Sequence, residues 1–509
     1  MKSKYFLLAC VSLVSWHANA QETYEMANIA TEDLNGTARY VSMGGAMDAL
    51  GADISTMNSN PAGIGLFRRS LVSVSFGLTN LPSTTPVLSS KKTIFSFDQV
   101  GIVYSMNTSY KKTSFLNIGF QYRKSRNFDQ ILNAANSLSG TSQNGLSHAK
   151  FNSKIIQVQN NTYDWGSNQV DRLYDSQMEF LTGTGAVDLT KNPVDATGYE
   201  FGRYSKGYIG EYALNVSGNI SNRLFLGVTL DLKDVHYTGE TQYVEQMKSN
   251  TISDKMGIED YRTVTGQGVD IKVGAIARPI ENSPFRLGLS ISTPTWYRLK
   301  SNNTTQLVSD PKVYITTMNR FHMNTPWKFG LSAGHTIGNF LAVGVGYDYA
   351  DYTAMDARIV DGYDEYGDET SYSDLQQNRH LQNTLKSVST FKVGAELKAS
   401  KNIALRAGYN RSTPMYKKSG VLGFYDNKYA VTYGNYNSST TDYTNWGACN
   451  HFTAGAGITC DNFVFDLAWQ YTRQEGQFSP FAPYNEHGNG STDVKFSRHQ
   501  LLATMSYKF

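Results

Sequence analysis

Residues 224–233 read LFLGVTLDLK, and leucine or valine fills every second position of this stretch. The intervening positions are small, polar or charged apart from Phe225, and they end in Asp231 and Lys233. Successive side chains of a strand point to opposite faces of a sheet. This stretch therefore predicts a strand with one apolar face and one polar face.

The same two-residue period recurs along the chain from Leu71 to the terminal Phe509. Scoring every stretch for this alternation predicts 14 strands, and an even number suits a closed antiparallel barrel. We expect these strands at 71–79, 98–106, 114–123, 207–219, 223–236, 266–280, 285–298, 320–337, 340–354, 385–399, 402–413, 450–460, 462–473 and 498–509.

The connections between the predicted strands alternate between short and long. Ser221-Asn222 and Gly338-Asn339 are short ones, whereas the largest long one is 124–206. A barrel inserted from the periplasm has short inner turns and long outer loops, whereas a propeller repeats every 40–50 residues or so. The sequence shows no such repeat. We therefore predict an all-β protein, a transmembrane antiparallel β-barrel of about 14 strands, over residues 71–509.

The composition agrees with a barrel and argues against other classes. Of 509 residues only 17% are charged and 13% are aromatic, and the mean hydropathy is −0.39. The chain lacks the runs of about 20 apolar residues that transmembrane helices need. A net charge of +3 is too small for a typical nucleic-acid binder.

The first 20 residues have the pattern of a secretory signal peptide. Lys2 and Lys4 precede the mostly apolar stretch 5–16, and Ala18-Asn19-Ala20 supplies the small residues of a cleavage site. We expect cleavage before Gln21. A lipoprotein signal ending at Cys10 is the alternative. Together with the barrel, a signal peptide predicts the outer membrane of a bacterium with two membranes.

The mature chain keeps two cysteines, Cys449 and Cys460, at opposite ends of one predicted strand. Eleven residues at about 3.4 Å each would separate them by more than about 30 Å. A disulfide needs Cα atoms within about 7 Å. We therefore predict two free thiols.

Residues 21–70 differ from the rest because they lack long alternating runs. They contain Gly44-Gly45 and the run Asn60-Pro61-Ala62-Gly63, which favour tight turns. A segment of this length has no core of its own, and a barrel of 14 strands leaves a lumen to be filled. We predict that residues 21–70 form a plug segment inside the barrel. A periplasmic tail is the alternative, but the apolar residues are too many for one.

This combination resembles the FadL/TodX family of outer-membrane transport proteins. The resemblance rests on the signal peptide, the small-residue stretch 38–68 with Asn60-Pro61-Ala62, the strand count and Phe509. It implies a 14-stranded barrel with an N-terminal hatch and passive uptake of hydrophobic compounds such as long-chain fatty acids. It also implies Gly44, Gly45, Asn60, Pro61, Ala62 and Gly63 as plug or gate residues.

Family members release their cargo sideways through a kink in the third strand. Here that strand is 114–123, which makes Asn117 and Gly119 at its middle the candidate lateral-exit residues. The loop 124–206 that follows contains many apolar residues. These residues predict either a cap with a capture site over the barrel mouth or a loop packed on itself.

The predicted lumen face carries both signs of charge. Mixed signs predict ion pairs across the lumen, and a cation among them can also receive a carboxylate headgroup. These residues are Asp231, Lys233, Lys272, Arg278, Arg286, Asp348, Lys392, Glu396, Arg406 and Asp466.

The sequence contains no catalytic motif and no metal-ligand spacing. We therefore predict a transporter and not an enzyme, a monomer without cofactor or metal. Its partners are hydrophobic small molecules and outer-membrane lipid, with no nucleic acid. The alternatives are a haem-binding or adhesive surface barrel, through its Tyr-rich loops, and a general porin.

Overall fold

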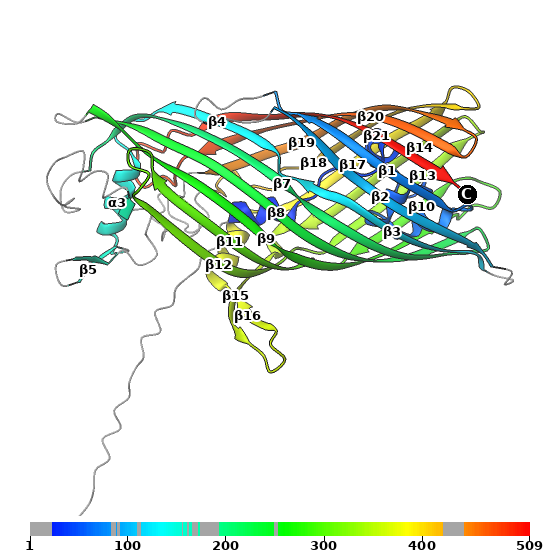
Figure 1. The fold of residues 1–509 in the computed structure, drawn as a ribbon, viewed down its shortest axis with the longest axis horizontal. Helices are drawn as coiled ribbons and strands as arrows, with labels where there is room; N and C mark the ends of the chain where they lie inside the picture. Colours follow the sequence, from blue (N-terminus) through cyan, green and yellow to red (C-terminus); the bar gives the residue numbers. More distant parts are fainter. Residues whose placement is uncertain are drawn as a thin grey trace, which may run out of the picture.

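Fourteen spans form one closed antiparallel barrel among the residues that the computed structural model describes (Figure 1). The described residues are 23–82, 88, 92–108, 113–154, 156–159, 162–164, 172–173, 193–248, 253–420 and 442–509. The predicted signal peptide 1–20 and its cleavage before Gln21 lie outside them. The barrel closes where the first span pairs with the last, from Leu71 opposite Lys508 to Asn80 opposite His499.

Four of the spans consist of two strands separated by a short interruption. These are β3 with β4, β10 with β11, β12 with β13, and β14 with β15. The wall strands are β1 (Leu71–Asn80), β2 (Thr93–Asn107), β3 (Thr113–Asn127), β4 (Gln130–Ser137), β7 (Ala196–Ile220), β8 (Leu224–Lys248), β9 (Ser253–Ala277), β10 (Arg286–Ser292), β11 (Trp296–Leu307), β12 (Tyr314–Asn324), β13 (Lys328–Ile337), β14 (Leu341–Asp351), β15 (Asp356–Tyr363), β17 (Ser387–Lys398), β18 (Ile403–Ser412), β19 (Tyr443–Cys460), β20 (Phe463–Ser479) and β21 (Thr492–Lys508).

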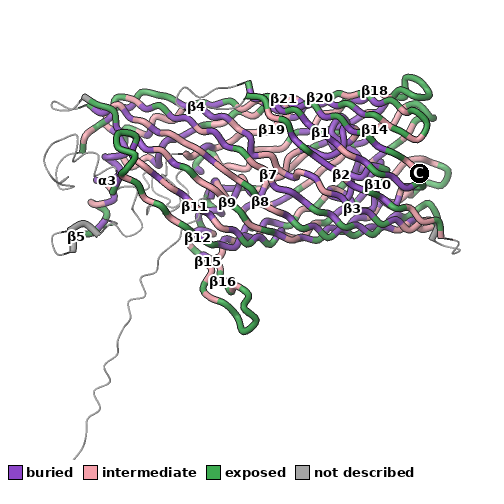
Figure 2. Tube along the Cα trace, viewed as in Figure 1, coloured by how far each residue is buried: buried purple, intermediate pink, exposed green. Residues whose placement is uncertain are grey.

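The alternation that predicted the strands places side chains as expected. In β8 every residue from Leu224 to Leu232 on the apolar set is exposed, and every intervening residue from Phe225 to Lys233 is buried. Figure 2 shows the same exchange of buried and exposed positions along the wall. The exposed leucines and valines form the lipid-facing band, so the predicted fold class and all 14 spans are confirmed.

The strands extend further than predicted on the side of the long loops. We call this side the upper end of the barrel, and it lies at the left in Figure 1. β7, β8 and β9 each hold 25 residues, and β4 and the first half of β7 lie within the predicted loop 124–206. At about 3.3 Å per residue these strands are longer than a lipid band about 25 Å tall requires. Beyond the band the outward residues are polar, as at Glu240 and Gln242, so the apolar alternation ends before the strand does.

An apolar cluster fills the barrel mouth below a helix of the long third-span loop. The helix α3 (Gln143–Asn152) is capped by Ser142, and Gln143 donates its backbone N–H to the buried carboxylate of Glu245 at 2.9 Å. Phe201 and Phe478 stack beneath it with ring centroids 4.5 Å apart. The short hairpin of β5 (Gln157–Gln159) and β6 (Thr162–Asp164) belongs to the same loop.

The N-terminal segment, residues 23–68, lies inside the barrel. It consists of α1 (Thr23–Ala30), α2 (Ala38–Ser42) and two 3-10 helices, η1 (Ile54–Asn58) and η2 (Pro61–Leu66). α2 contacts β18 to β21, whereas η2 contacts β3 and β7 to β9, so the segment touches opposite parts of the inner wall (Figure 1). Most of its residues are buried.

Three further elements lie on the half of the barrel nearer the long loops, which is the left half in Figure 1. They are η3 (Tyr352–Ala354), α5 (Leu375–Thr384) and β16 (Glu369–Ser373), which forms a projecting hairpin with β15. Among the described residues, no helix is both long and apolar enough to cross a membrane.

Candidate functional site in the barrel lumen

The glycine pair of the N-terminal segment forms a turn against the wall. Gly44 and Gly45 have φ values of +63° and +75°, a region that residues with a Cβ rarely adopt. A Cβ on Gly44 would lie 2.8 Å from the backbone nitrogen of Tyr409 in β18. The turn therefore requires glycine both for its conformation and for its close approach to the wall.

The run Asn60-Pro61-Ala62-Gly63 begins η2 and lies against strands β7 to β9. The side chain of Asn60 accepts a hydrogen bond from the backbone N–H of Ala62 at 3.2 Å, which caps the helix. The carbonyl oxygen of Pro61 accepts one from Ser217 of β7 at 2.9 Å. On Gly227 of β8, a Cβ would lie 2.5 Å from the carbonyl carbon of Pro61. Wall and segment are therefore in direct backbone contact here.

Gly63 has a packing role inside the segment itself. A Cβ at this position would lie 2.4 Å from the Thr56 hydroxyl oxygen, so η1 and η2 come together only around a glycine. Ala62 is fully buried against Phe225 and Ile276 of the wall. Five of the six predicted plug residues thus make the close contacts just described. The sixth, Gly45, lies beside Leu34 and Tyr40.

Asn117 and Gly119 of the third span lie beneath the N-terminal segment. Asn117 donates from its side-chain amide to the carbonyl oxygen of Ile64 at 2.6 Å, and a Cβ on Gly119 would lie 2.0 Å from Cε of Met57. Both residues are paired with β2 and β7 without a register shift. Their contacts are therefore those of a seat for η1 and η2.

Ion pairs join the N-terminal segment to the wall at four further points. Glu25 pairs with Arg262, and Asp48 pairs with Lys392. Arg39 forms two hydrogen bonds to Glu396, from Nε to Oε2 at 2.8 Å and from Nη2 to Oε1 at 3.1 Å. Asp33 accepts from Arg126 and Arg498 at 2.7 and 3.1 Å. These contacts hold the first half of the segment, from Glu25 to Asp48.

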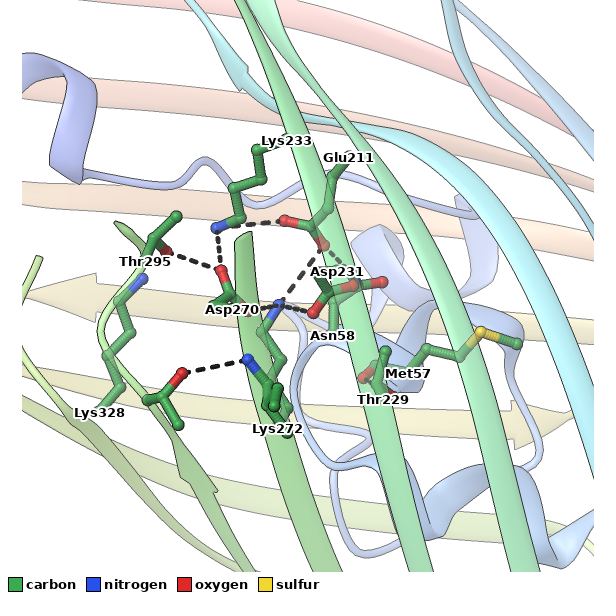
Figure 3. Close-up of polar contacts among 12 residues, drawn as sticks. Met57, Asn58, Glu211, Thr229, Asp231, Lys233, Asp270, Lys272, Thr295 and Lys328 are labelled. Atoms are coloured by element: carbon green, nitrogen blue, oxygen red, sulfur yellow. Dashed lines mark hydrogen bonds and ion pairs between the residues drawn. The ribbon is translucent and has the colours of Figure 1, made fainter. Parts of the chain in front are cut away.

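Glu32 connects the segment to a buried cluster of charges on β7 to β9. Its carboxylate lies 3.1 Å from Lys233, 2.8 Å from Lys328 and 3.1 Å from Arg123. Glu211 at the centre of the cluster is fully buried and lies within 3.5 Å of three cations. Figure 3 shows it facing Lys233, Lys272 and Asn58.

The remaining members of this cluster pair across neighbouring strands. Lys272 contacts Asp231 at 2.8 Å, Lys233 contacts Asp270 at 3.1 Å, and Thr295 donates to Asp270 at 2.7 Å. The predicted pairing of opposite charges in the lumen is therefore present here and at the Lys392–Asp348, Arg406–Glu396 and Arg406–Asp466 pairs. Glu211 and Glu32, the two acids that organise the cluster, were absent from the predicted set.

The lumen shifts the pKa values of the acids on the N-terminal segment in opposite directions. Burial alone would raise the pKa of Glu32, but Lys233, Lys328, Lys272 and Arg123 outweigh it and hold that pKa well below the usual range. Burial is likewise outweighed at Asp33 by Arg126 and Arg498, so its pKa is also lowered. At Glu25 burial outweighs Arg262 and raises the pKa.

A cavity of about 380 Å³ lies between α1 and the wall. One part of its lining is aromatic or aliphatic and the other part is charged. The apolar part includes Ile29, Phe128, Tyr237, Tyr352, Tyr416 and Phe496. The charged part includes Arg126, Arg203, Arg262, Lys328, Lys392 and Arg498 together with Glu25, Glu32 and Asp33. A compound with an apolar body and a polar end fits such a lining.

The free thiol of Cys449 also lines this cavity, with its Sγ 3.5 Å from Nε2 of His451. Cys460 is exposed and also free, so the prediction of two unbonded thiols is confirmed. Among the described residues, no group of three or more His, Cys, Asp or Glu side chains is arranged to hold a metal ion.

The first helix reaches the loops at the mouth of the barrel. The hydroxyl of Thr23 lies 2.6 Å from Nδ1 of His380 in α5. The ring of Tyr24 stacks on Tyr416 with centroids 5.2 Å apart. The segment therefore contacts the outer loops at its first residues, Thr23 and Tyr24, and the strands of the barrel wall at η2. Sequence periodicity contains no signal for this placement.

Several solved structures are similar to this barrel in fold. A FadL homologue of Pseudomonas aeruginosa matches 94% of this chain and 99% of its own length, with a TM-score of 0.51 and 11% identity. The chain has the fold of a FadL homologue. The resemblance predicted from the N-terminal motif is thereby confirmed at the level of the fold.

Two further structures cover similar shares of the chain at lower TM-scores. They are the toluene transporters TbuX of Ralstonia pickettii, at 14% identity and a TM-score of 0.48, and TodX of Pseudomonas putida, at 11% and 0.48. Each matches 94% of this chain and 99% of its own. No family model matches the sequence. No curated protein matches it either.

Proposed function

We propose that this chain is an outer-membrane channel for the passive uptake of hydrophobic compounds, with residues 21–70 as its plug and 71–509 as its barrel. One observation carries the proposal. A closed barrel contains a segment that is bound to the wall along its length, and a cavity with apolar and charged walls remains beside α1. An open porin would not need such a segment.

Long-chain fatty acids are the cargo class that we favour. An acyl chain would lie against the apolar part of the cavity, at Phe128 and Tyr352. The carboxylate would exchange with Asp33 at the guanidinium groups of Arg126 and Arg498, because these two groups line the cavity. Paired cations recognise carboxylates well in a lumen with little water.

We further propose that cargo leaves through the wall beside the third span. The pairing of β2 with β3 ends at Gln99 opposite Arg123, although β3 continues to Asn127. Above that point side chains bridge the two strands. Lys124 of β3 donates to Ser96 of β2 at 2.7 Å, and Asn35 of the N-terminal segment donates both to Asp98 of β2 at 3.0 Å and to the Lys124 carbonyl at 3.1 Å. Asn117 and Gly119 lie lower and act as the seat of the plug.

The gate residues test the proposal. Changing Asn60 and Pro61 together to alanine removes the η2 cap and loosens the plug where it contacts β8. Uptake of radiolabelled oleate by cells that express this variant should change, while the barrel keeps its heat-modifiable mobility on a gel. Unchanged oleate uptake with normal expression would contradict a gating role.

The cargo class is tested by extraction. Protein purified in mild detergent is extracted with organic solvent, and the bound compounds are identified by mass spectrometry. Fatty acids or other amphiphiles near one per chain support the proposal. Haem would instead favour a haem-binding surface barrel, whose Tyr-rich loop 421–441 lies outside the described residues. An empty lumen with high conductance would favour a porin. We expect neither cofactor nor catalysis, and a monomer.

A further inference from the structure

The wall is interrupted across three adjacent spans at one height. Below the interruption Ser292 pairs with Lys328, which pairs with Ala350. Above it Trp296 pairs with Asn324, which pairs with Asp356. The intervening residues 293–295, 325–327 and 351–355 have no register partners across these strands. We name these three stretches together the seam.

Two prolines explain why the seam forms. Pro294 and Pro326 occupy the middle of the first two stretches, and a proline has no N–H to donate to a neighbouring strand. Among the described residues, only Thr295 and Thr325 join the first two stretches. Thr325 donates its backbone N–H to the Thr295 carbonyl oxygen at 3.1 Å, and Thr295 donates its backbone N–H to the Thr325 hydroxyl oxygen at 2.8 Å. In the third stretch Asp351 still pairs with Ser387 of β17, and the chain then turns into η3.

The seam lies at the upper edge of the lipid-facing band. Below it Leu289 and Leu331 are exposed to lipid, whereas above it Arg298 and Arg320 are exposed and paired with residues of the β15–β16 hairpin. Trp296 borders the first stretch of the seam and Trp327 ends the second, and their side chains are 44% and 50% exposed. Tryptophan is typical of the interface between hydrocarbon and headgroups. The outer opening of the seam therefore meets the outer leaflet.

The cavity reaches the same place from inside. Ser292, Lys328 and Tyr352, at the lower edge and within the third stretch, all line it. Tyr352 lines the cavity and is 6% exposed, and it belongs to one apolar cluster with Met355 of the same stretch and Ile29 of α1. Among the described residues, side chains and not paired backbone thus close the wall between the second and third stretches of the seam.

We propose that the seam is a second lateral portal, through which hydrophobic or amphiphilic compounds pass between the lumen cavity and the outer leaflet. Tyr352 and Met355 are its gate. A compound moving through it contacts proline, tryptophan, tyrosine and methionine, so its apolar body stays out of water while its polar end remains at the interface. The portal is distinct from the opening beside the third span, and it rests on the proposed function only in taking hydrophobic compounds as the traffic.

The native thiol in the cavity allows a test that needs no cargo. In a Cys460→Ser background, Cys449 is the remaining mature cysteine and lines the cavity. The protein is reconstituted into phosphatidylcholine–phosphatidylglycerol vesicles. Labelling of Cys449 is followed with pyrene maleimide, which partitions into the bilayer, and with a charged methanethiosulfonate that stays in water.

Removing the gate should speed labelling from the lipid phase only. We expect Tyr352→Ala and Met355→Ala each to raise the rate of pyrene-maleimide labelling several-fold and to leave labelling by the charged reagent unchanged. Tyr237→Ala is the matched control, because it removes an equal ring from the cavity lining away from the seam. Two gate variants are used so that one folded variant suffices, with folding checked by heat-modifiable mobility.

Two results would overturn the portal. One is a wild-type rate of lipid-phase labelling in every folded gate variant. The other is an equal rise in Tyr237→Ala, which would show that any loosening of the cavity admits the reagent. Asn35 contacts Lys124 of the third span. A faster lipid-phase labelling of Cys449 in Asn35→Ala alone would therefore assign the lipid route to the third span and reject the seam. Failure of oleate uptake would leave these outcomes unaffected, so the two proposals fail separately.

Discussion

Arg39 and Glu396 are joined by two hydrogen bonds, one end on the N-terminal segment and the other on β17. The same carboxylate accepts a third bond from Arg406 of β18 at 2.7 Å, and Arg406 pairs in turn with Asp466 of β20. The segment is thus linked through one guanidinium to three spans of the wall. A segment held in this way resists displacement without a covalent bond.

Removing that guanidinium should loosen the segment. We expect Arg39→Ala to lower the free energy of local opening around α2 by about 2 kcal/mol, the loss typical of hydrogen bonds to a charged group. Hydrogen exchange of the α2 amides measures this opening. Glu396→Ala should have a similar effect, and the double variant should lose less than the sum. Fully additive losses would mean that the two residues act independently.

The turn at Gly44 should tolerate no side chain. Gly44→Ala forces a left-handed conformation that costs about 1–2 kcal/mol and places a methyl group against the Tyr409 backbone. We expect the barrel to fold and the segment to lose exchange protection. Gly218→Ala in β7 is the control, since a Cβ there has no heavy atom within 4 Å. Equal protection in the two variants would show that the turn does not fix the segment.

Much of the fold follows from local patterns. The alternation in 224–233 predicts both the strand and which side chains face lipid, because a strand in a membrane has only two environments. The upper ends of β7 to β9 were not predicted, because their outer faces meet water above the lipid band and need no apolar alternation there.

The site was predicted less well than the fold. Periodicity places Asp231 and Lys233 in the lumen, but it does not report which residues lie opposite one another in space. Glu211 was therefore missed, although it is the centre of the buried charges. Asn117 was assigned to an exit by resemblance, and that role stays a prediction, but its hydrogen bond to the carbonyl oxygen of Ile64 was not predicted. Such contacts join residues on different strands, from 22 positions apart for Glu211 and Lys233 to 88 for Glu211 and Arg123, beyond the reach of any local pattern.

The centre of the buried charge cluster should be essential for stability. Glu211→Gln removes one charge from among Arg123, Lys233 and Lys272, and leaving buried cations under-compensated costs about 3–5 kcal/mol. Unfolding by guanidinium chloride in detergent micelles measures this loss. Glu240→Gln, which removes a partly exposed partner of Lys206, should change stability by less than about 0.5 kcal/mol. A comparable loss in both variants would mean that charge removal acts through the net charge of the barrel.

The contact between α1 and α5 should weaken as the pH falls. Gln377 donates to the Thr23 hydroxyl oxygen at 2.7 Å, and the Thr23 hydroxyl lies 2.6 Å from Nδ1 of His380, to which it can donate when the ring is neutral. Burial lowers the pKa of His380 to about 4 from its usual 6.5. Between these values the detached ring binds a proton that the packed ring does not. Stability is therefore full above about pH 6.5 and is lost as the pH falls toward 4.

Hydrogen exchange of the α1 amides, corrected for intrinsic rates, measures this dependence between pH 7 and pH 5. We expect protection to fall over that range in the wild type. In His380→Gln, which keeps an acceptor but does not titrate, the dependence should disappear. Glu25 is the neighbouring acid on α1, and its raised pKa acts in the opposite direction, because its burial costs less once it is protonated. The difference between the two proteins therefore isolates His380, and equal slopes in both would exclude the imidazole as the origin.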